Sequence, residues 1–172
     1  AAQADRTLAE AWQSRRAYPL VVTQGDGNLG VKGKNFEMLF SIAGAGPASL
    51  KVNGTEWLWR APRPAFWRAS TDNDRGCGFP LRAAAWMAAD VFVTYNGMKV
   101  LEAGSDCVKV QFQFGIPTVP GASAELVYTV EAQGALRVDA VYHGVAGAPE
   151  LPCFGVKFET FGPVTRTVCT GL

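Results

Sequence analysis

Residues 64–78, PAFWRASTDNDRGCG, decide how the rest of the chain is interpreted. The aromatic, basic, acidic and amide residues in this stretch are Phe66, Trp67, Arg68, Asp72, Asn73, Asp74 and Arg75. The Asp-Asn-Asp run is poor in β-propensity and Arg-Gly-Cys-Gly favours a turn, so the stretch is not an ordinary strand. Two aromatic residues lead into it, so it is not an ordinary solvent loop either. We predict a short buried strand at 65–69 that delivers a polar knot, the name used below for residues 66–75.

The arginines and aspartates of the knot are expected to bind each other. A planar guanidinium can bond a carboxylate bidentately, so Arg68 or Arg75 should pair with Asp72 or Asp74. Arginine neighbours favour the ionised carboxylate, which works against a proton donor. We therefore interpret the aspartates as an ion-paired structural loop and expect Asp72 to matter for stability. A calcium site on the same oxygens stays open, although EF-hand spacing with a distal glutamate is absent.

Outside the knot, the sequence predicts an all-β fold, an antiparallel β-sandwich with one short helix. Asn53-Gly54 can supply the positive-φ residues of a type I′ turn, which is a strong hairpin signal. Residues 107–115, CVKVQFQFG, alternate between apolar and polar side chains like a half-solvated strand. Residues 80–89, with a proline in the first turn and an alanine-rich body, are the one predicted helix. The other predicted strands are 20–24, 28–31, 36–42, 50–52, 56–59, 91–101, 123–131, 135–142, 152–160 and 164–169.

Composition excludes several classes of protein. The 172 residues include 16 Lys plus Arg and 15 Asp plus Glu, which gives a net charge of +1. This charge does not indicate binding to nucleic acid or to an anionic membrane. No apolar run has the length of a membrane span, and residues 1–16 lack the layout of a signal peptide, so we expect a cytoplasmic protein. Charged residues make up 18% and hydrophobic residues 48%, which suggests that another protein surface covers part of this one.

Four cysteines are present: Cys77, Cys107, Cys153 and Cys169. They show no C-x-x-C spacing and have no histidine nearby, so a zinc site is not predicted. Three of them lie in apolar, strand-like runs, which favours free buried thiols over disulfides. We expect Cys77, in the turn that follows the knot, to be the most exposed.

The knot also carries a resemblance to a known family. FWRASTDNDRG at 66–76 closely resembles the signature near the start of the C-terminal β-sandwich domain of bacterial β-galactosidases, a region that belongs to the small subunit of split enzymes. GKNFEMLFSIAGAGPASLKVNGTEWL (33–58), GFPLRAAAW (78–86) and LPCFGVKFE (151–159) resemble its flanks in the same order. The resemblance implies a supersandwich like that of galactose mutarotase, formed by the first part of that domain at 20–172, with residues 1–19 as a linker from a preceding domain.

In this family the acid/base and nucleophile glutamates lie on a TIM-type barrel, no part of which is matched here. The resemblance therefore implies a non-catalytic portion of a retaining β-galactosidase that braces the barrel and walls the substrate pocket. Its protein partner would be the catalytic barrel domain of the same enzyme. The parent enzyme would be oligomeric, and its substrate would be a β-galactoside. It implies no cofactor in this chain, and Mg²⁺ and Na⁺ as candidates in the parent. The chain stops where a Gly-x-Gly-Pro-x-Glu-x-Tyr type motif would begin, so we expect a fragment that is inactive alone.

Two other functions remain open. Trp57 and Trp59 alternate with Leu58 and would share a face in a strand. Such indoles can stack on sugar rings, as in a free-standing carbohydrate-binding module, or can lie in the core or in an inter-domain contact. His143, the only histidine, could act as the general acid of an epimerase-like enzyme, since the family's sandwich resembles that fold. A histidine at a strand end beside a turn is more often a surface or capping residue.

Overall fold

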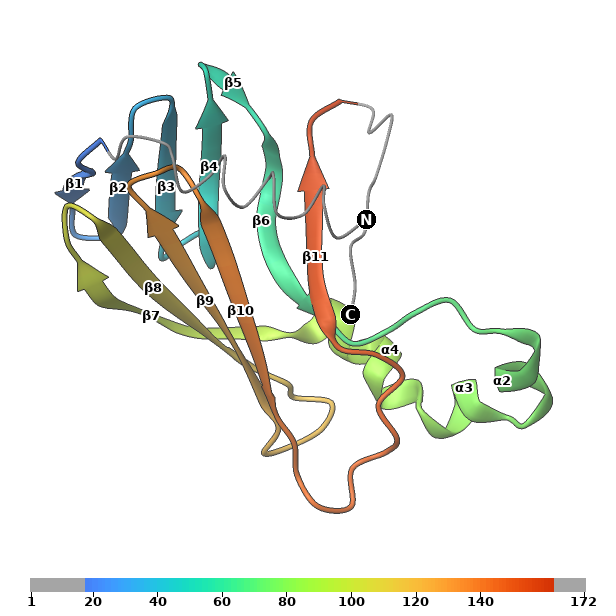
Figure 1. Ribbon diagram of the computed structural model, residues 1–172. Coiled ribbons are helices and arrows are strands. Elements are labelled where there is room, and N and C mark those ends of the chain that lie inside the picture. The colour runs from blue at the N-terminus through green and yellow to red at the C-terminus, as the bar shows by residue number, and fades with distance from the viewer. Residues whose placement is uncertain (1–17, 163–172) are drawn as a thin grey trace, which may run out of the picture.

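The computed structural model describes residues 18–162, and in this range antiparallel sheets enclose a hydrophobic core (Figure 1). One sheet has the order β1-β2-β3-β4-β5, and the facing sheet has the order β10-β9-β8-β7. A two-stranded sheet, β11-β6, lies beside β4 (Figure 1). The strands are β1 (Val21–Gln24), β2 (Asn28–Lys32), β3 (Phe36–Ser41), β4 (Gly46–Val52), β5 (Thr55–Glu56), β6 (Leu58–Ala65), β7 (Thr94–Ala103), β8 (Cys107–Gly115), β9 (Ser123–Glu131), β10 (Leu136–His143) and β11 (Gly155–Thr160). The predicted all-β antiparallel sandwich is confirmed.

Aromatic side chains from both sheets meet in the core. The Phe40 ring of β3 lies 6.1 Å from that of Phe112 on β8 and 5.7 Å from that of Tyr128 on β9. All three side chains are fully buried. Along β8, alternate residues face this core and the intervening residues, mostly polar, are more exposed, which is why the sequence pattern identified this strand.

The hairpin predicted from Asn53-Gly54 is confirmed. Both residues have positive φ, 49° and 79°, and they connect β4 to β5. Asparagine and glycine tolerate this left-handed conformation better than other residues, so a local sequence signal was sufficient here. The predicted strands at 107–115 and 123–131 match β8 and β9 residue for residue.

The prediction of a single helix at 80–89 is wrong. Three helices follow the knot's aromatic residues: α2 (Asp72–Gly76), α3 (Phe79–Arg82) and α4 (Ala84–Phe92). They run from the tip of a protruding arm back toward the sandwich (Figure 1). Gly78 has a φ of 69° and separates α2 from α3, so the chain turns at a position that favours glycine. Because α4 extends to Phe92, the strand predicted from residue 91 begins only at Thr94.

The strand predicted at 65–69 is also wrong. Strand β6 ends at Ala65, and residues 66–70 have no strand partner. The N–H of Phe66 donates instead to Asp90 Oδ1 on α4, at 2.6 Å. The Asp90 carboxylate of α4 therefore accepts the backbone hydrogen bond that a carbonyl of a neighbouring strand would accept in a sheet.

The remaining structural predictions have mixed outcomes. Cys77, Cys107 and Cys153 are free; Cys77 is exposed, as predicted, and the other two are partly rather than fully buried. Burial is the main factor that raises the pKa of the Cys107 and Cys153 thiols. Most of the predicted linker, the strand at 164–169 and Cys169 lie outside the described residues. Within 18–162, no helix has the length and apolarity that a membrane crossing requires.

Candidate functional site

The polar knot contains a short capped helix. Thr71 precedes α2, and its hydroxyl accepts the Asp74 N–H at 3.2 Å. In return, Asp74 Oδ2 accepts the Thr71 N–H at 2.8 Å, which completes a capping box. The helix buries none of its own residues, so its stability comes from these local bonds and from its neighbours in the knot.

Arg68 and Asp74 form one of the predicted ion pairs. Arg68 Nη1 lies 2.6 Å from Asp74 Oδ2, and Nη2 lies 3.2 Å from Oδ1, a bidentate arrangement. Arg68 Nε also donates to the Pro152 carbonyl at 3.3 Å and so joins the knot to the segment before β11. The second pair, Arg75 with Asp72, is 3.6 Å apart, and the Asp72 side chain is 97% exposed. Exposed pairs of this kind contribute little to stability.

Asp74 is held as an anion. The hydrogen bond from Arg68, and after it the Thr71 N–H, keep the pKa of the Asp74 carboxyl well below its usual range. A carboxyl of this kind accepts hydrogen bonds and does not donate a proton near neutral pH. The geometry therefore favours the structural interpretation of the knot over a catalytic one.

An aromatic cluster of Phe66, Trp86 and Phe154 packs beside the polar knot. The Phe66 ring is fully buried and lies 5.7 Å from Trp86 on α4 and 5.8 Å from Phe154 before β11. Trp86 is fully buried, and its indole N–H donates to the Pro149 carbonyl at 3.0 Å. Trp67 is only partly buried, so the expectation that both knot aromatics lie beneath it holds fully for Phe66 alone.

Trp57 and Trp59 are not core residues. They are 52% and 56% exposed, so the core alternative is wrong, and a contact surface or a sugar platform remains. Trp59 meets the ring of Phe161 edge-on, with centroids 4.8 Å apart. Phe158 on β11 is also half exposed. The sequence pattern did not identify the two phenylalanines, because their exposure depends on where β11 pairs.

His143 ends β10 on the protein surface. Its Nε2 lies 3.5 Å from Glu125 Oε1, and Gln111 Nε2 donates to the other oxygen of this glutamate at 2.6 Å. Glu125 therefore contacts both side chains, and among residues 18–162 it is the one acidic group paired with His143. The epimerase-like alternative thus gains nothing from the described residues. No cluster of three His, Cys, Asp or Glu side chains that could hold a metal ion occurs in 18–162. The calcium alternative therefore gains no support from these residues either.

Sequence reasoning missed the role of Glu56. Its Oε1 accepts the backbone N–H groups of Leu50, Trp57 and Leu58 at 2.9, 3.1 and 3.0 Å, and the Ser49 hydroxyl donates to Oε2. Burial raises the pKa of Glu56, but these hydrogen bonds outweigh it and lower the pKa overall. The carboxylate anchors the corner where β4, β5 and β6 meet. Proximity to the Asn53-Gly54 turn was the one available signal.

Comparison with known proteins identifies the family. Residues 32–167 match the family described as the β-galactosidase small chain. The β-galactosidase small subunit of Latilactobacillus sakei is 41% identical over 172 residues, an alignment that covers 89% of this chain and 54% of that protein. β-Galactosidases of Clostridium acetobutylicum and Streptococcus thermophilus are each 37% identical, over 80% and 81% of this chain.

The relatives are longer than this chain. It spans about half of the Latilactobacillus small subunit, and only 15% and 14% of the Clostridium and Streptococcus proteins. The family match begins at the last residue of β2, covers every later strand of the sandwich, and includes the knot, α2, α3 and α4. This chain therefore belongs to the β-galactosidase small-chain family.

Proposed function

We propose that this chain is the first part of the C-terminal β-sandwich domain of a β-galactosidase and does no chemistry itself. One observation carries the proposal. The same region recurs in a relative called a small subunit and as about one-seventh of relatives called β-galactosidases. Such a distribution is expected of an accessory domain that works with a much larger catalytic portion, whether or not the two are covalently joined.

The geometry of the described carboxylates supports this division of labour. A retaining glycosidase needs an acid and a nucleophile whose carboxyl groups lie roughly 5 Å apart. Asp74 is bound by Arg68, Glu56 by three backbone N–H groups and Glu125 by Gln111. We assign both reacting groups, and any Mg²⁺ or Na⁺ that the enzyme needs, to the catalytic barrel outside this chain.

In this proposal the chain packs against the catalytic barrel and supports it, and it forms one side of the β-galactoside pocket. Four half-exposed aromatic residues of β6, β11 and their flanks are grouped here as the aromatic shelf: Trp57, Trp59, Phe158 and Phe161. Apolar aromatic surface of this kind is enriched where protein partners meet. We assign this shelf to the contact with the larger, catalytic portion.

A co-elution experiment tests the assignment. The chain, mixed with the β-galactosidase large chain of the same organism, should elute with it in size-exclusion chromatography. The double variant Trp57→Ala/Trp59→Ala should bind the large chain about tenfold more weakly, the loss expected for two aromatic contacts, and should therefore co-elute with it less. The matched control Leu136→Ala/Val141→Ala removes exposed apolar side chains from β10 and should assemble normally. Assembly that is equal in all three proteins would contradict the assignment.

The exposed tryptophans also favour a second function, that of a free carbohydrate-binding module. Galactose would then quench the tryptophan fluorescence of the isolated chain at micromolar concentrations, and the Trp57→Ala/Trp59→Ala variant would lose the response. We expect no such quenching, because the shelf is assigned to a protein contact. A saturable response that depends on these tryptophans would replace the first proposal with this one.

A further inference from the structure

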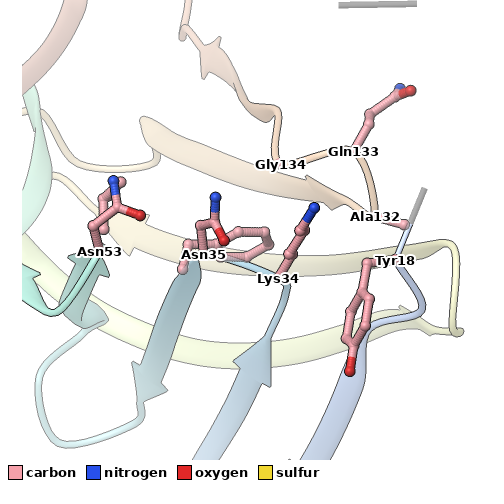
Figure 2. Close-up of a pocket in the computed structure, with 9 residues that line it drawn as sticks. Tyr18, Lys34, Asn35, Asn53, Ala132, Gln133 and Gly134 are labelled. Atoms are coloured by element: carbon pink, nitrogen blue, oxygen red, sulfur yellow. The ribbon is translucent and has the colours of Figure 1, made fainter. Parts of the chain in front are cut away.

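A cavity of about 490 Å³ opens at one end of the sandwich, where turns from both sheets meet (Figure 2). We call it the tip pocket. Residues from the β2–β3 turn, the β4–β5 turn and the β9–β10 turn line it, together with Tyr18 before β1. Its lining residues are Tyr18, Lys34, Asn35, Phe36, Val52, Asn53, Ala132, Gln133 and Gly134. Its volume lies within the range of small-molecule sites, roughly 300–1,000 Å³.

The walls of the tip pocket are fixed by backbone bonds. The Asn53 N–H donates to the Asn35 carbonyl at 2.8 Å and ties two of the turns together. The Gly134 N–H donates to the Glu131 carbonyl at 2.8 Å and closes the third. Such a site needs little ordering before it binds, which lowers the free-energy cost of binding.

The Phe36 ring is locked in place at the same point. A Cβ on Gly33 would lie 2.1 Å from this ring, and a Cβ on Gly134 would lie 3.8 Å from it. The ring therefore fills space that only a glycine at position 33 leaves free, and it reaches from one sheet to the turn of the other. An aromatic ring held between two turns offers a fixed flat surface to a ligand.

The polar side chains of the tip pocket are mostly amides. Asn35 and Asn53 each carry a donor and an acceptor, and Lys34 adds donors. Gln133 Nε2 already donates to Glu131 Oε2, so Gln133 offers chiefly its carbonyl oxygen as an acceptor. The side chains of Lys34, Asn35 and Asn53 point to the same side, whereas Gln133 lies on the turn of the other sheet with its amide directed away from them (Figure 2). No carboxylate is among the lining residues of the tip pocket, which argues against a metal ion there.

This combination matches the surface of a sugar. A pyranose presents an apolar C–H face that can stack on an aromatic ring, and hydroxyl groups at its rim that both donate and accept hydrogen bonds. We propose that the tip pocket binds a neutral sugar unit, with Phe36 under its C–H face and the amides of Asn35, Asn53 and Gln133 at its hydroxyls. Neither Trp57 nor Trp59 lines this pocket, so the inference is independent of the aromatic shelf and of the proposed function.

A second hollow extends the site. It has a volume of about 460 Å³, shares residues 34–36 and Asn53 with the tip pocket, and is lined further by Lys32, Glu37 and Lys51. Lys32 and Glu37 are paired at 2.6 Å, so this part offers a charged pair with both donors and acceptors. Two adjoining hollows suit two linked sugar units. The ligand class is therefore a neutral disaccharide or a longer saccharide.

Side-chain amide signals in the ¹⁵N–¹H NMR spectrum of the full 172-residue chain test the proposal. Lactose, cellobiose and maltose are added separately, up to roughly 50 mM, well above the millimolar Kd expected for a weak site. At least one of them should shift the side-chain amide signals of Asn35, Asn53 and Gln133 along a saturating curve. The variant Asn35→Ala/Gln133→Ala should weaken binding by roughly tenfold, the effect of two lost hydrogen bonds.

The matched control is Gln113→Ala, which removes an exposed amide from β8 and should leave the affinity unchanged. A dispersed spectrum of each variant establishes that it is folded. The proposal is overturned if none of the three disaccharides shifts the pocket amides, or if the curves are identical in the double variant. It is equally overturned if the shifts fall on the indole signals of Trp57 and Trp59 instead.

Discussion

Arg68 holds the knot together at the level of single residues. Its guanidinium donates to both oxygens of Asp74 and to the carbonyls of Ala69 and Pro152. The Asp74 carboxylate also receives the N–H of Thr71, so one side chain joins the arginine to the start of α2. The sequence showed that an arginine would pair with an aspartate here. It could not show which, because the choice depends on a helix start that the Asp-Asn-Asp composition does not suggest.

Asp74 rather than Asp72 should control the stability of α2. In Asp74→Ala, which removes the acceptor for Arg68 and for the Thr71 N–H, amide hydrogen exchange in α2 should accelerate by roughly fivefold, the scale of one lost capping interaction, whereas Asp72→Ala should change it little. The sign of the pH effect follows from the lowered pKa of Asp74. Its stabilisation is complete above the ordinary aspartate pKa of about 3.9 and is lost as the pH falls through the lower, folded-state value. Equal exchange rates in the two variants would contradict the assignment.

Phe66 should be the residue of the knot that matters most for global stability. Its ring is fully buried among Trp86, Tyr142 and Phe154, so Phe66→Ala should lower the free energy of unfolding by about 3–5 kcal/mol. Phe158→Ala, at a half-exposed position on β11, is the matched control and should cost much less. Urea denaturation of both variants measures the difference, and similar midpoints would show that the cluster is not a core.

Secondary-structure elements differ in how far the sequence could define them. Strand β8 and the β4–β5 hairpin rest on local signals, namely alternation and an Asn-Gly turn, and were predicted correctly. Helix α2 was missed, because five residues of low helix propensity fold as a helix only through the Thr71 cap and the Arg68 contact. The tip pocket was invisible for a related reason. Its amides come from turns up to 100 positions apart in the sequence, and only the packing of two sheets unites them.

Glu56 should be a structural anchor for the corner between β4, β5 and β6. Glu56→Ala leaves the N–H groups of Leu50, Trp57 and Leu58 without their acceptor. Allowing for partial exposure, we expect a loss of about 1–2 kcal/mol in the free energy of unfolding. Glu150→Ala, an exposed glutamate in the connection before β11, is the control and should be nearly neutral. Urea unfolding at neutral pH compares them, and an equal effect of both changes would refute the anchoring role.

The described part of the molecule combines one hydrophobic core with half-exposed aromatic residues on its surface. Both sheets and α4 contribute to one hydrophobic cluster. The side chains of the aromatic shelf are about half exposed. The arm that carries α2 and α3 extends away from the sheets (Figure 1). Composition alone suggested such an uncovered surface, through its low share of charged residues. Which residues form it could not be predicted, since the pairing of β11 with β6 links positions almost 100 residues apart.

The non-catalytic role within a β-galactosidase that we propose for this chain is tested most directly by an activity assay. A chromogenic β-galactoside is incubated with the purified chain alone, with the large chain alone and with the two together. We predict no turnover above the uncatalysed rate for this chain alone, and higher activity in the mixture than in the large chain alone. Turnover by the isolated chain that disappears on changing one of its own Asp or Glu residues to the amide would contradict the account.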